Sequence, residues 1–301
     1  MSRRARWAFA VMSVVWGASY LLIKIGIDGG LPAADVAWLR VALAAVILMV
    51  LAWRAGALGT LRGRWGWVLA YAVAEISIPF PLIALGEVHI ASSLAAIIIA
   101  SVPLIVTVLS LRFDPSERPT PLRALGLIIG FAGVIALVGI DVAGSGPELL
   151  GALAVLVGAV GYAIGPMLVK LGMAGMDSRA AMGASLMLAT LILAPFAALD
   201  LPARTPTVGA LAAVAALGVF CTALAFVVYT VLVREAGTGR ATIITYINPL
   251  VAVVLGVTLL GERPGPGALA GLVLILGGSW LSTQGRLPAR SSGRTERTPV
   301  G

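Results

Sequence analysis

Long apolar stretches, separated by short polar ones, run through almost the whole of this 301-residue chain. Each is roughly 18–22 residues long, enough for a helix to cross the hydrocarbon core of a bilayer, which is about 30 Å thick. Backbone groups in lipid must be satisfied within their own segment, so each stretch is expected to be helical. The pattern predicts ten spans, at about 7–26, 36–53, 65–85, 92–111, 122–140, 149–170, 180–199, 208–233, 241–260 and 267–284.

The two halves of the chain carry the same landmarks in the same order. Glu-Arg-Pro at 117–119 recurs at 262–264, Pro103 matches Pro249, and the stretch 16–24 aligns with 162–170, so the offset is 145 or 146 residues. Each half holds five spans, an odd number, so the second copy enters the membrane upside down. The sequence therefore predicts an all-α membrane protein of two inverted five-helix repeats, 8–140 and 149–284, with a disordered cytoplasmic tail at 286–301.

The positions of lysine and arginine predict the orientation. With the N-terminus in the cytoplasm, four of the 21 basic residues, Lys24, Arg40, Arg204 and Arg263, fall on the external side, which leaves 17 on the cytoplasmic side. This bias predicts a multi-pass protein of the cell membrane with both termini cytoplasmic. Membrane topology also explains the net charge of +8, so no nucleic-acid partner is expected. One cysteine, Cys221, excludes an intramolecular disulfide.

Four motifs resemble those of the EamA family of the drug/metabolite transporter superfamily. They are Trp16-Gly through Lys24, Trp38-Leu-Arg40, the stretch 84–96 with Pro103 downstream, and 241–249 running into Leu-Gly-Glu-Arg-Pro at 260–264. The resemblance covers about residues 8–285 and implies ten helices and the transport of small metabolites, commonly export. The first copy departs from the pattern, because it has Phe-Asp-Pro-Ser at 113–116 where the second has Leu-Gly.

Two charged residues within the spans occur in one copy only, which makes them better candidates for substrate chemistry than residues that both copies share. Arg40 either holds a substrate carboxylate with two hydrogen bonds or pairs with Asp28 or Asp35 at the same end of the membrane. Glu75 lies near the midplane, where protonation relieves the cost of a buried charge, so we expect it to bind a coupling proton. A hydrogen-bonded structural glutamic acid is the alternative.

Aromatic and polar residues three or four apart share helix faces on several spans. We expect these faces to meet in one central basket whose aromatic walls hold an organic solute. For the aromatic residues, ordinary helix packing explains the pattern equally well. The substrate-binding candidates are Arg40, Trp16, Tyr20, Tyr71, Tyr246 and Asn248.

Residues that occur in both copies are assigned to the scaffold or to gating. Glu117 and Glu262, each two residues before a proline, are expected to mark the start of the next helix. Lys24 and Lys170 lie near span ends, where snorkelling is favoured over a gating role. Pro103 and Pro249 are expected to break helices inside the membrane, either at the cavity or as tolerated packing features.

Glu87 and His89 are placed in a loop before the fourth span, at the external face. One histidine and one carboxylate fall short of a metal site. A loop pair or a pH sensor, which the titration range of histidine would suit, are the alternatives.

These features favour a secondary transporter, not an enzyme, that moves an amino acid or related solute, preferably outward, by alternating access. The expected partners are a small solute, the lipid bilayer and protons. The sequence does not decide between a monomer and a homodimer. No Gly-x-x-x-x-Gly-Lys motif is present, and neither ATP, a cofactor nor a metal is expected. The alternatives are an integral-membrane enzyme or a flippase acting on a lipid-linked substrate, and a membrane sensor. The enzyme would need clustered acidic or histidine residues, whereas the carboxylates are scattered singly.

Overall fold

The computed structural model describes residues 2–113, 120–142, 144–237 and 241–284, and these residues are almost entirely helical. Glu117 and the tail at 286–301 lie outside the described residues. The helices are α1 (Arg3–Asp28), α2 (Ala33–Arg54), η1 (Ala57–Leu61), α3 (Trp65–Tyr71), η2 (Ala72–Ser77), α4 (Pro79–His89), α5 (Ser92–Ile99), α6 (Val102–Phe113), α7 (Pro121–Leu137), η3 (Val138–Val142), α8 (Gly146–Leu168), η4 (Val169–Met173), α9 (Ser178–Leu199), α10 (Val208–Gly218), η5 (Val219–Leu224), α11 (Ala225–Ala236), α13 (Ile244–Leu259) and α14 (Pro266–Gln284).

Nine continuous helical segments of the described chain are long and apolar enough to cross a membrane. α13 is apolar too but shorter, and it occupies the ninth expected span, 241–260. The all-helical class is therefore confirmed, and a tenth crossing through α13 stays a prediction. The nine segments are Arg3–Asp28, Ala33–Arg54, Trp65–His89, Ser92–Phe113, Pro121–Val142, Gly146–Met173, Ser178–Leu199, Val208–Ala236 and Pro266–Thr283.

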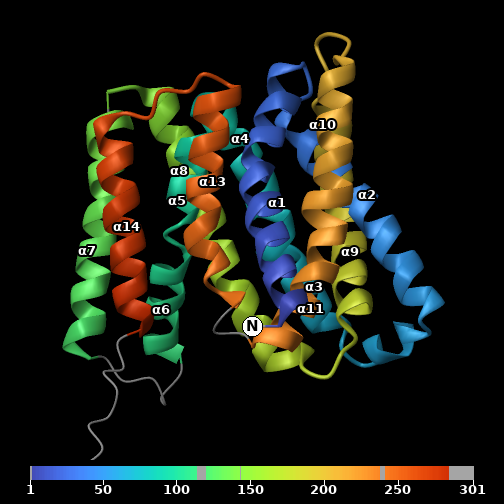
Figure 1. The fold of residues 1–301 in the computed structure, drawn as a ribbon. Helices are drawn as coiled ribbons and strands as arrows, with labels where there is room; N and C mark the ends of the chain where they lie inside the picture. Colours follow the sequence, from blue (N-terminus) through green and yellow to red (C-terminus); the bar gives the residue numbers. More distant parts are fainter. Residues whose placement is uncertain (1, 114–119, 143, 238–240, 285–301) are drawn as a thin grey trace, which may run out of the picture.

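Helices from the two halves of the chain pack against one another. α7 lies along α14 at one side of the bundle, α2 lies along α9, α1 contacts α10 and α11, and α4 contacts α8 (Figure 1). Glycines permit the close approach of α7 and α14, since a β-carbon at Gly126 would come within 2.5 Å of the backbone nitrogen of Ser282. Small residues of this kind let membrane helices touch backbone to backbone.

Of the four π-helical segments in the described residues, η3 and η4 end spans, whereas η2 and η5 lie within spans at equivalent places in the two halves. η2 joins α3 to α4, and η5 joins α10 to α11. The repeat offset of 146 residues relates Glu75 on η2 to Cys221 on η5. Because π-helical segments inside α-helices are rare and frequently occur at functional sites, these two segments direct attention to the side chains they carry.

The bundle has two ends, which we call the N-end, where the chain begins, and the far end (Figure 1). At the far end the backbone N–H of Thr207 donates to the carbonyl of Gly29, with a distance of 2.9 Å between nitrogen and oxygen. At the N-end the backbone N–H of Asp177 donates to the hydroxyl oxygen of Thr60 at 3.3 Å. Both contacts join segments from different halves of the chain, Thr60 being on η1, so the two halves are tied together at both ends.

Candidate functional site

The guanidinium group of Arg40 is buried between the two halves of the chain, and its residue is 7% exposed. Its Nε donates to the hydroxyl oxygen of Thr222 on η5 at 2.8 Å, and its central carbon lies 4.0 Å from the ring centroid of Phe80 on α4. Within the part of the chain that the structure describes, Nη1 and Nη2 have no hydrogen-bond acceptor. This free edge has the planar geometry that binds a carboxylate through two parallel hydrogen bonds.

Thr222 is oriented for this contact by the π-helical segment that carries it. Its hydroxyl donates to the carbonyl of Leu217, five residues earlier, at 3.0 Å, which leaves the oxygen free to accept from Arg40. Of the partners expected for Arg40, Asp28 lies next to Lys24 instead, with 3.8 Å between carboxylate oxygen and ammonium nitrogen. The buried arginine is therefore held by a neutral hydroxyl and an aromatic face, which leave its charge available.

Aromatic side chains surround the arginine. The rings of Phe80 and Tyr162 meet edge to face, with centroids 6.2 Å apart and an angle of 79° between the planes. Tyr20 on α1 and Tyr162 on α8 are both close enough to Arg40 to interact with it electrostatically. Together they form a wall with phenol groups, which suits an organic solute that has both polar and apolar parts.

A second aromatic group lies nearer the N-end. The rings of Trp16 on α1 and Tyr229 on α11 are in contact, with centroids 5.2 Å apart. Tyr71 at the end of α3 is buried and interacts electrostatically with Tyr229 and Glu75. Of the expected aromatic residues, the structure thus brings Tyr20 close to Arg40, whereas Trp16 and Tyr71 lie around Tyr229 and Glu75.

The carboxyl group of Glu75 on η2 lies against α8. Gly165 leaves the space for it, since a β-carbon at that position would come within 1.7 Å of Oε2 of Glu75. Oε2 is buried and has no hydrogen-bond partner among the described residues. An unpaired carboxylate in such surroundings is costly when ionised and far less so when protonated. The protonated form therefore fits this position, and the proton-coupling role of Glu75 stays a prediction.

The other two expected substrate-binding residues make contacts typical of helix packing. The hydroxyl of Tyr246 on α13 lies 2.9 Å from that of Thr283 on α14. The amide nitrogen of Asn248, in the orientation that satisfies its hydrogen bonds, donates to the carbonyl of Ser13 on α1 at 3.2 Å. The structure therefore does not bring these side chains to Arg40, and a role in solute binding stays a prediction for both.

The lysines that the two halves share lie in different surroundings. Lys24 on α1 is partly buried, and its ammonium donates to the backbone carbonyl of Glu87 at 2.7 Å. Lys170 is exposed on η4 near the N-end. Lys24 thus ties α1 to α4 at the far end, which is more than the snorkelling expected of it.

The two prolines that the halves share also differ. α5 ends at Ile99 and α6 begins at Val102, so the helix is interrupted just before Pro103 as expected. The carbonyl of Ala100 in this interruption accepts a hydrogen bond from the hydroxyl of Ser279 at 3.4 Å. The expected break at Pro249 is wrong, because α13 runs from Ile244 to Leu259 without interruption. The proline lies close to the start of that helix, where it removes only one early hydrogen bond.

Glu262 closes the far end of the bundle by capping a helix of the other half, and not the helix that follows it. Its Oε1 accepts from the backbone N–H and the hydroxyl of Ser92, each at 2.8 Å, and Oε2 accepts from the N–H of Ser93 at 3.0 Å. These residues begin α5, where unpaired N–H groups favour a negative charge. Burial alone would raise the pKa of Glu262, but the hydrogen bonds from Ser93 and Ser92 outweigh it and hold that pKa below its usual value.

Asp141 makes a contact of the same kind nearby. Its carboxylate accepts from the backbone N–H groups of Gly267 at 3.0 Å and Ala268 at 2.5 Å, at the start of α14. The two carboxylates thus clamp the far end across the halves, Asp141 from the first half and Glu262 from the second.

The structure corrects the placement of Glu87 and His89. Both belong to the last turn of α4, not to a loop, and only His89 is exposed. Glu87 is 0% exposed, and neither of its carboxyl oxygens has a hydrogen-bond partner in the described part of the chain. The apolar run ends near residue 85 in the sequence, but the helix continues because α8 packs closely there, with Gly151 against Gly86 and His89.

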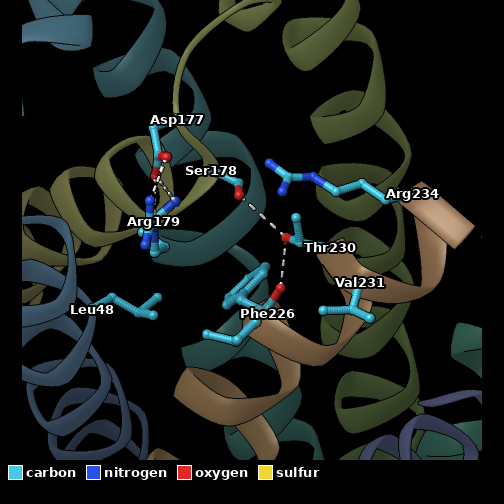
Figure 2. A pocket seen from close by; sticks show the side chains of 9 residues that line it. Leu48, Asp177, Ser178, Arg179, Phe226, Thr230, Val231 and Arg234 are labelled. Carbon is cyan, nitrogen blue, oxygen red and sulfur yellow. Dashed lines mark hydrogen bonds and ion pairs between the residues drawn. The ribbon is translucent and has the colours of Figure 1, made fainter. Parts of the chain in front are cut away.

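A cavity of about 190 Å³ opens at the N-end between α2, α9 and α11 (Figure 2). Leu48, Phe226 and Val227 line its apolar part, and the side chain of Arg234 points toward it. Phe226 lies one helical turn from Thr222, whose hydroxyl accepts the hydrogen bond from Arg40, whereas Arg40 itself does not line the cavity.

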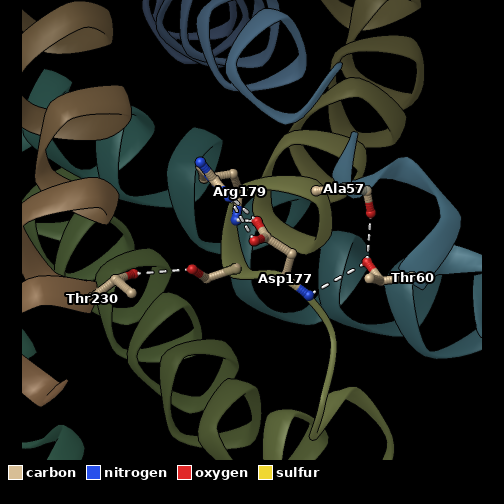
Figure 3. Close-up of polar contacts among 6 residues, drawn as sticks. Ala57, Thr60, Asp177, Arg179 and Thr230 are labelled. Atoms are coloured by element: carbon tan, nitrogen blue, oxygen red, sulfur yellow. Dashed lines mark hydrogen bonds and ion pairs between the residues drawn. The ribbon is translucent and has the colours of Figure 1, made fainter. Parts of the chain in front are cut away.

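Polar contacts fix the rim of this cavity (Figure 3). The carboxylate of Asp177 binds the guanidinium of Arg179 at 3.0 and 2.8 Å, and this hydrogen-bonded pair holds the pKa of Asp177 below its usual value. The hydroxyl of Thr230 donates to that of Ser178 at 3.3 Å. These contacts connect α9 to α11 and to the loop that carries Thr60.

Several residues of the site were missed by sequence reasoning. Thr222, Phe80, Tyr229 and Gly165 carry no local signal, because their role comes from partners far away in the sequence. Tyr162 could have been found, since it aligns with Trp16 in the repeat. Among the described residues, no group of three or more His, Cys, Asp or Glu side chains could hold a metal ion.

Comparison with known proteins assigns the family. The model of the EamA-like transporter family matches residues 4–139 and again 149–284. The chain is 30% identical over 267 residues to the uncharacterized inner membrane transporter YedA of Escherichia coli, a match covering 85% of this chain and 82% of YedA. It is 29% identical over 307 residues to the probable terminal-alkyne amino-acid exporter of Streptantibioticus cattleyicolor, covering 97% of each.

A solved crystal structure has the same fold, with a TM-score of 0.67 and 21% identity over 93% of this chain and 97% of the other. The chain belongs to the EamA-like transporter family and is a membrane transporter.

Proposed function

We propose that this protein is a secondary transporter that exports a small amino-acid-like solute across the cytoplasmic membrane by alternating access. The proposal rests chiefly on Arg40, a buried guanidinium whose Nη edge is free and whose surroundings are aromatic. A charged group is costly inside a membrane, so one that is kept there usually serves a function. The guanidinium matches the carboxylate of an amino acid, and a relative aligned over 97% of each chain is named as a probable terminal-alkyne amino-acid exporter.

The packing of the helices supports two inverted halves of five helices each. Exchanging the halves turns the contacts of α1 with α10 and α11 into the contacts of α8 with α3 and α4. The same exchange maps the α2–α9 and α7–α14 contacts onto themselves. With the N-end placed in the cytoplasm, the positive-inside bias of 17 to 4 is satisfied and both termini are cytoplasmic.

The two ends of the bundle differ in a way that suits one state of an alternating-access cycle. The carboxylates of Glu262 and Asp141 close the far end, which is then the external end. The cavity lies at the N-end, the cytoplasmic end, and Phe226 in its wall is one helical turn from Thr222, the hydrogen-bond partner of Arg40. A solute from the cytoplasm would reach the arginine from this end and leave on the other side once the far-end clamp opens.

Glu75 is the proposed coupling residue. Its carboxyl group is partly buried on the π-helical segment η2, against Gly165, and Oε2 lacks a donor. A proton bound there from the external side and released to the cytoplasm would drive solute in the opposite direction. The interaction with Tyr71 ties this titration to the aromatic wall of the site.

Metabolite profiling of cells tests the function. Cells that overproduce the protein should deplete one or a few amino-acid-like solutes inside and enrich them in the medium, relative to cells that lack it. Cells that overproduce the Arg40→Gln variant, at the same amount of protein in the membrane, are the matched control. Their metabolite profile should equal that of cells that lack the protein. Identical profiles of wild-type and lacking cells, across conditions in which the protein is present in the membrane, would reject the proposal.

A further inference from the structure

Glu87 is a second buried carboxyl group within the spans, and the proposed transport mechanism does not use it. It lies in the last turn of α4, twelve residues and about 18 Å along the span from Glu75. It is 0% exposed, and both Oε1 and Oε2 lack a hydrogen-bond partner within the described residues. A buried polar group without a partner is unusual in a folded protein and calls for a functional explanation.

The two cations near Glu87 attract a negative charge on it, but neither forms a hydrogen bond with its carboxyl oxygens. On α1, the ammonium of Lys24 donates a hydrogen bond to the backbone carbonyl of Glu87 at 2.7 Å. The same ammonium lies 3.8 Å from the carboxylate of Asp28. Arg40 on α2 interacts with Glu87 electrostatically, but its Nε is bonded to Thr222.

The remaining titratable neighbours would oppose a negative charge on Glu87. Glu262 lies in the segment between α13 and α14. The N–H groups at the start of α5 hold it ionised, and it repels a second carboxylate. The carboxylate of Asp28 on α1 repels a charged Glu87 too, and the phenol of Tyr20 is neutral. The neutral acid is therefore the form that fits this arrangement, because an ionised carboxylate would be buried beside Glu262 without a donor.

We propose that the carboxyl group of Glu87 is a proton-binding site of the far-end clamp: it is protonated while Glu262 is seated on α5, and it releases its proton to water when that contact opens. Ser92 and Ser93, which hold Glu262, lie five and six residues beyond Glu87 in the chain. Departure of Glu262 removes the repelling charge and uncovers the corner between α4 and α5. The ionised carboxylate then pairs with Lys24.

A hollow at this end of the bundle begins two residues beyond Glu87 in the chain. The hollow, of about 470 Å³, is lined by His89 of α4, Ser93 and Leu94 of α5, Asp141 and Arg263. His89 is exposed there, two residues from Glu87. Acidic conditions on the far side would therefore hold the clamp shut, and alkaline conditions would favour its opening. The assignment of this site to a transport cycle rests on the proposed function, whereas proton binding itself does not.

Infrared spectroscopy of the full chain in lipid vesicles tests proton binding without any solute. At neutral pH the carboxylic-acid C=O band should lose one component in Glu87→Gln, and Glu87→Asp should shift that component without removing it. Glu148→Gln, which changes a partly exposed carboxylate at the same end in the first turn of α8, should leave the band unchanged. A Glu87→Gln spectrum identical to wild type in this region would overturn the proposal, because Glu87 would then be ionised.

A labelling experiment tests the link to the clamp. Ala96 is 2% exposed, one turn beyond Ser92 on α5, and an Ala96→Cys change in a Cys221→Ala background places a thiol behind the clamp. Labelling by a membrane-impermeant reagent from the far side should rise with pH much less when Glu87→Gln is added. Comparing the same thiol in both backgrounds cancels its own titration. An unchanged pH dependence would refute the link.

Failure of this inference can be told apart from failure of the proposed function. A wild-type protein that carries no solute would defeat the function, yet the infrared and labelling results would stand. A protein that transports well, but whose Glu87→Gln variant has a wild-type spectrum and a wild-type pH dependence of labelling, would defeat the inference alone.

Discussion

The carboxyl group of Glu75 lies against the backbone of Gly165, at a point where a β-carbon would come within 1.7 Å of Oε2. Glycine is thus required on α8 for the third span to carry an acidic side chain at this depth. Gly165→Ala should displace the carboxyl group and lower the free energy of unfolding by about 1–3 kcal/mol, as overpacking does in well-packed interiors. Thermal unfolding of the purified protein, followed by tryptophan fluorescence, measures the loss.

Gly66→Ala is the matched control for that change. Gly66 lies on α3 in the same span as Glu75, and a β-carbon there meets nothing within 4 Å. This variant should keep wild-type stability or gain a few tenths of a kcal/mol from alanine's higher helix propensity. Equal stability of Gly165→Ala and Gly66→Ala would show that the carboxyl group is not confined by α8.

Replacing Glu75 by glutamine separates proton coupling from solute movement. Glu75→Gln resembles the protonated acid, so it should abolish accumulation driven by a pH gradient in inverted membrane vesicles. Exchange of solute between the two sides without a gradient should persist, because the binding region around Arg40 is intact. Glu148→Gln should behave as wild type in both assays. Undiminished uphill transport by Glu75→Gln would make the residue structural.

The extents of the helices could be predicted from sequence because membrane thickness limits them. The structure extends most of the expected spans by one to four residues at one or both ends, as at Arg3–Asp28 and Gly146–Met173. The placement of Glu87 failed for a related reason: hydropathy marks where a chain turns polar, but the helix ends only where its packing against α8 ends. The polar residues at the end of α4 were therefore assigned to a loop.

Which residues contact one another in the site was harder to predict than which residues belong to it. Periodicity shows that Tyr246 shares a face with Pro249, yet it does not show that this face meets α14 through Thr283. In the same way, the position of Arg40 was read from one span, whereas its partner Thr222 lies 182 residues away. Long-range pairing follows from how the two halves dock, and one sequence alone does not encode it locally.

Glu262 should stabilise the closed far end in a pH-dependent way. Glu262→Ala removes three hydrogen bonds at the start of α5 and should cost about 1–2 kcal/mol at neutral pH, as for the loss of a helix cap. Because the pKa of Glu262 is lowered in the folded protein, its contribution is present above the usual carboxyl pKa, about 4.3, and is lost as pH falls through the lowered value.

Thermal unfolding of wild type and Glu262→Ala across pH measures this contribution. The difference between them should be constant near neutral pH and shrink only below about pH 4. Asp200→Ala, which removes an exposed carboxylate at the same end, is the control and should show little difference at any pH. A Glu262→Ala protein as stable as wild type at pH 7 would contradict the capping role.

The inverted arrangement predicts that equivalent loops lie on opposite sides of the membrane. Arg118→Cys and Arg263→Cys, each in a Cys221→Ala background, mark the repeated Glu-Arg-Pro phrase in the two halves. A membrane-impermeant thiol reagent applied to whole cells should label the cysteine at 263 and should reach the one at 118 only after the cells are opened. Labelling of both from outside would rule out the inverted repeat.

Counterflow in proteoliposomes tests the central claim most directly, namely that this chain is a carrier whose Arg40 holds the solute carboxylate. Vesicles loaded with an unlabelled amino-acid mixture should transiently accumulate labelled solute when wild type is present. Arg40→Lys should raise the half-saturating concentration about tenfold, since the charge stays but one of two hydrogen bonds is lost, and Arg40→Gln should raise it further. Arg204→Gln, which changes an exposed arginine at the far end, should match wild type. Wild-type vesicles that accumulate no more label than protein-free ones would contradict the transport function, and wild-type kinetics in Arg40→Gln would remove the arginine from the site.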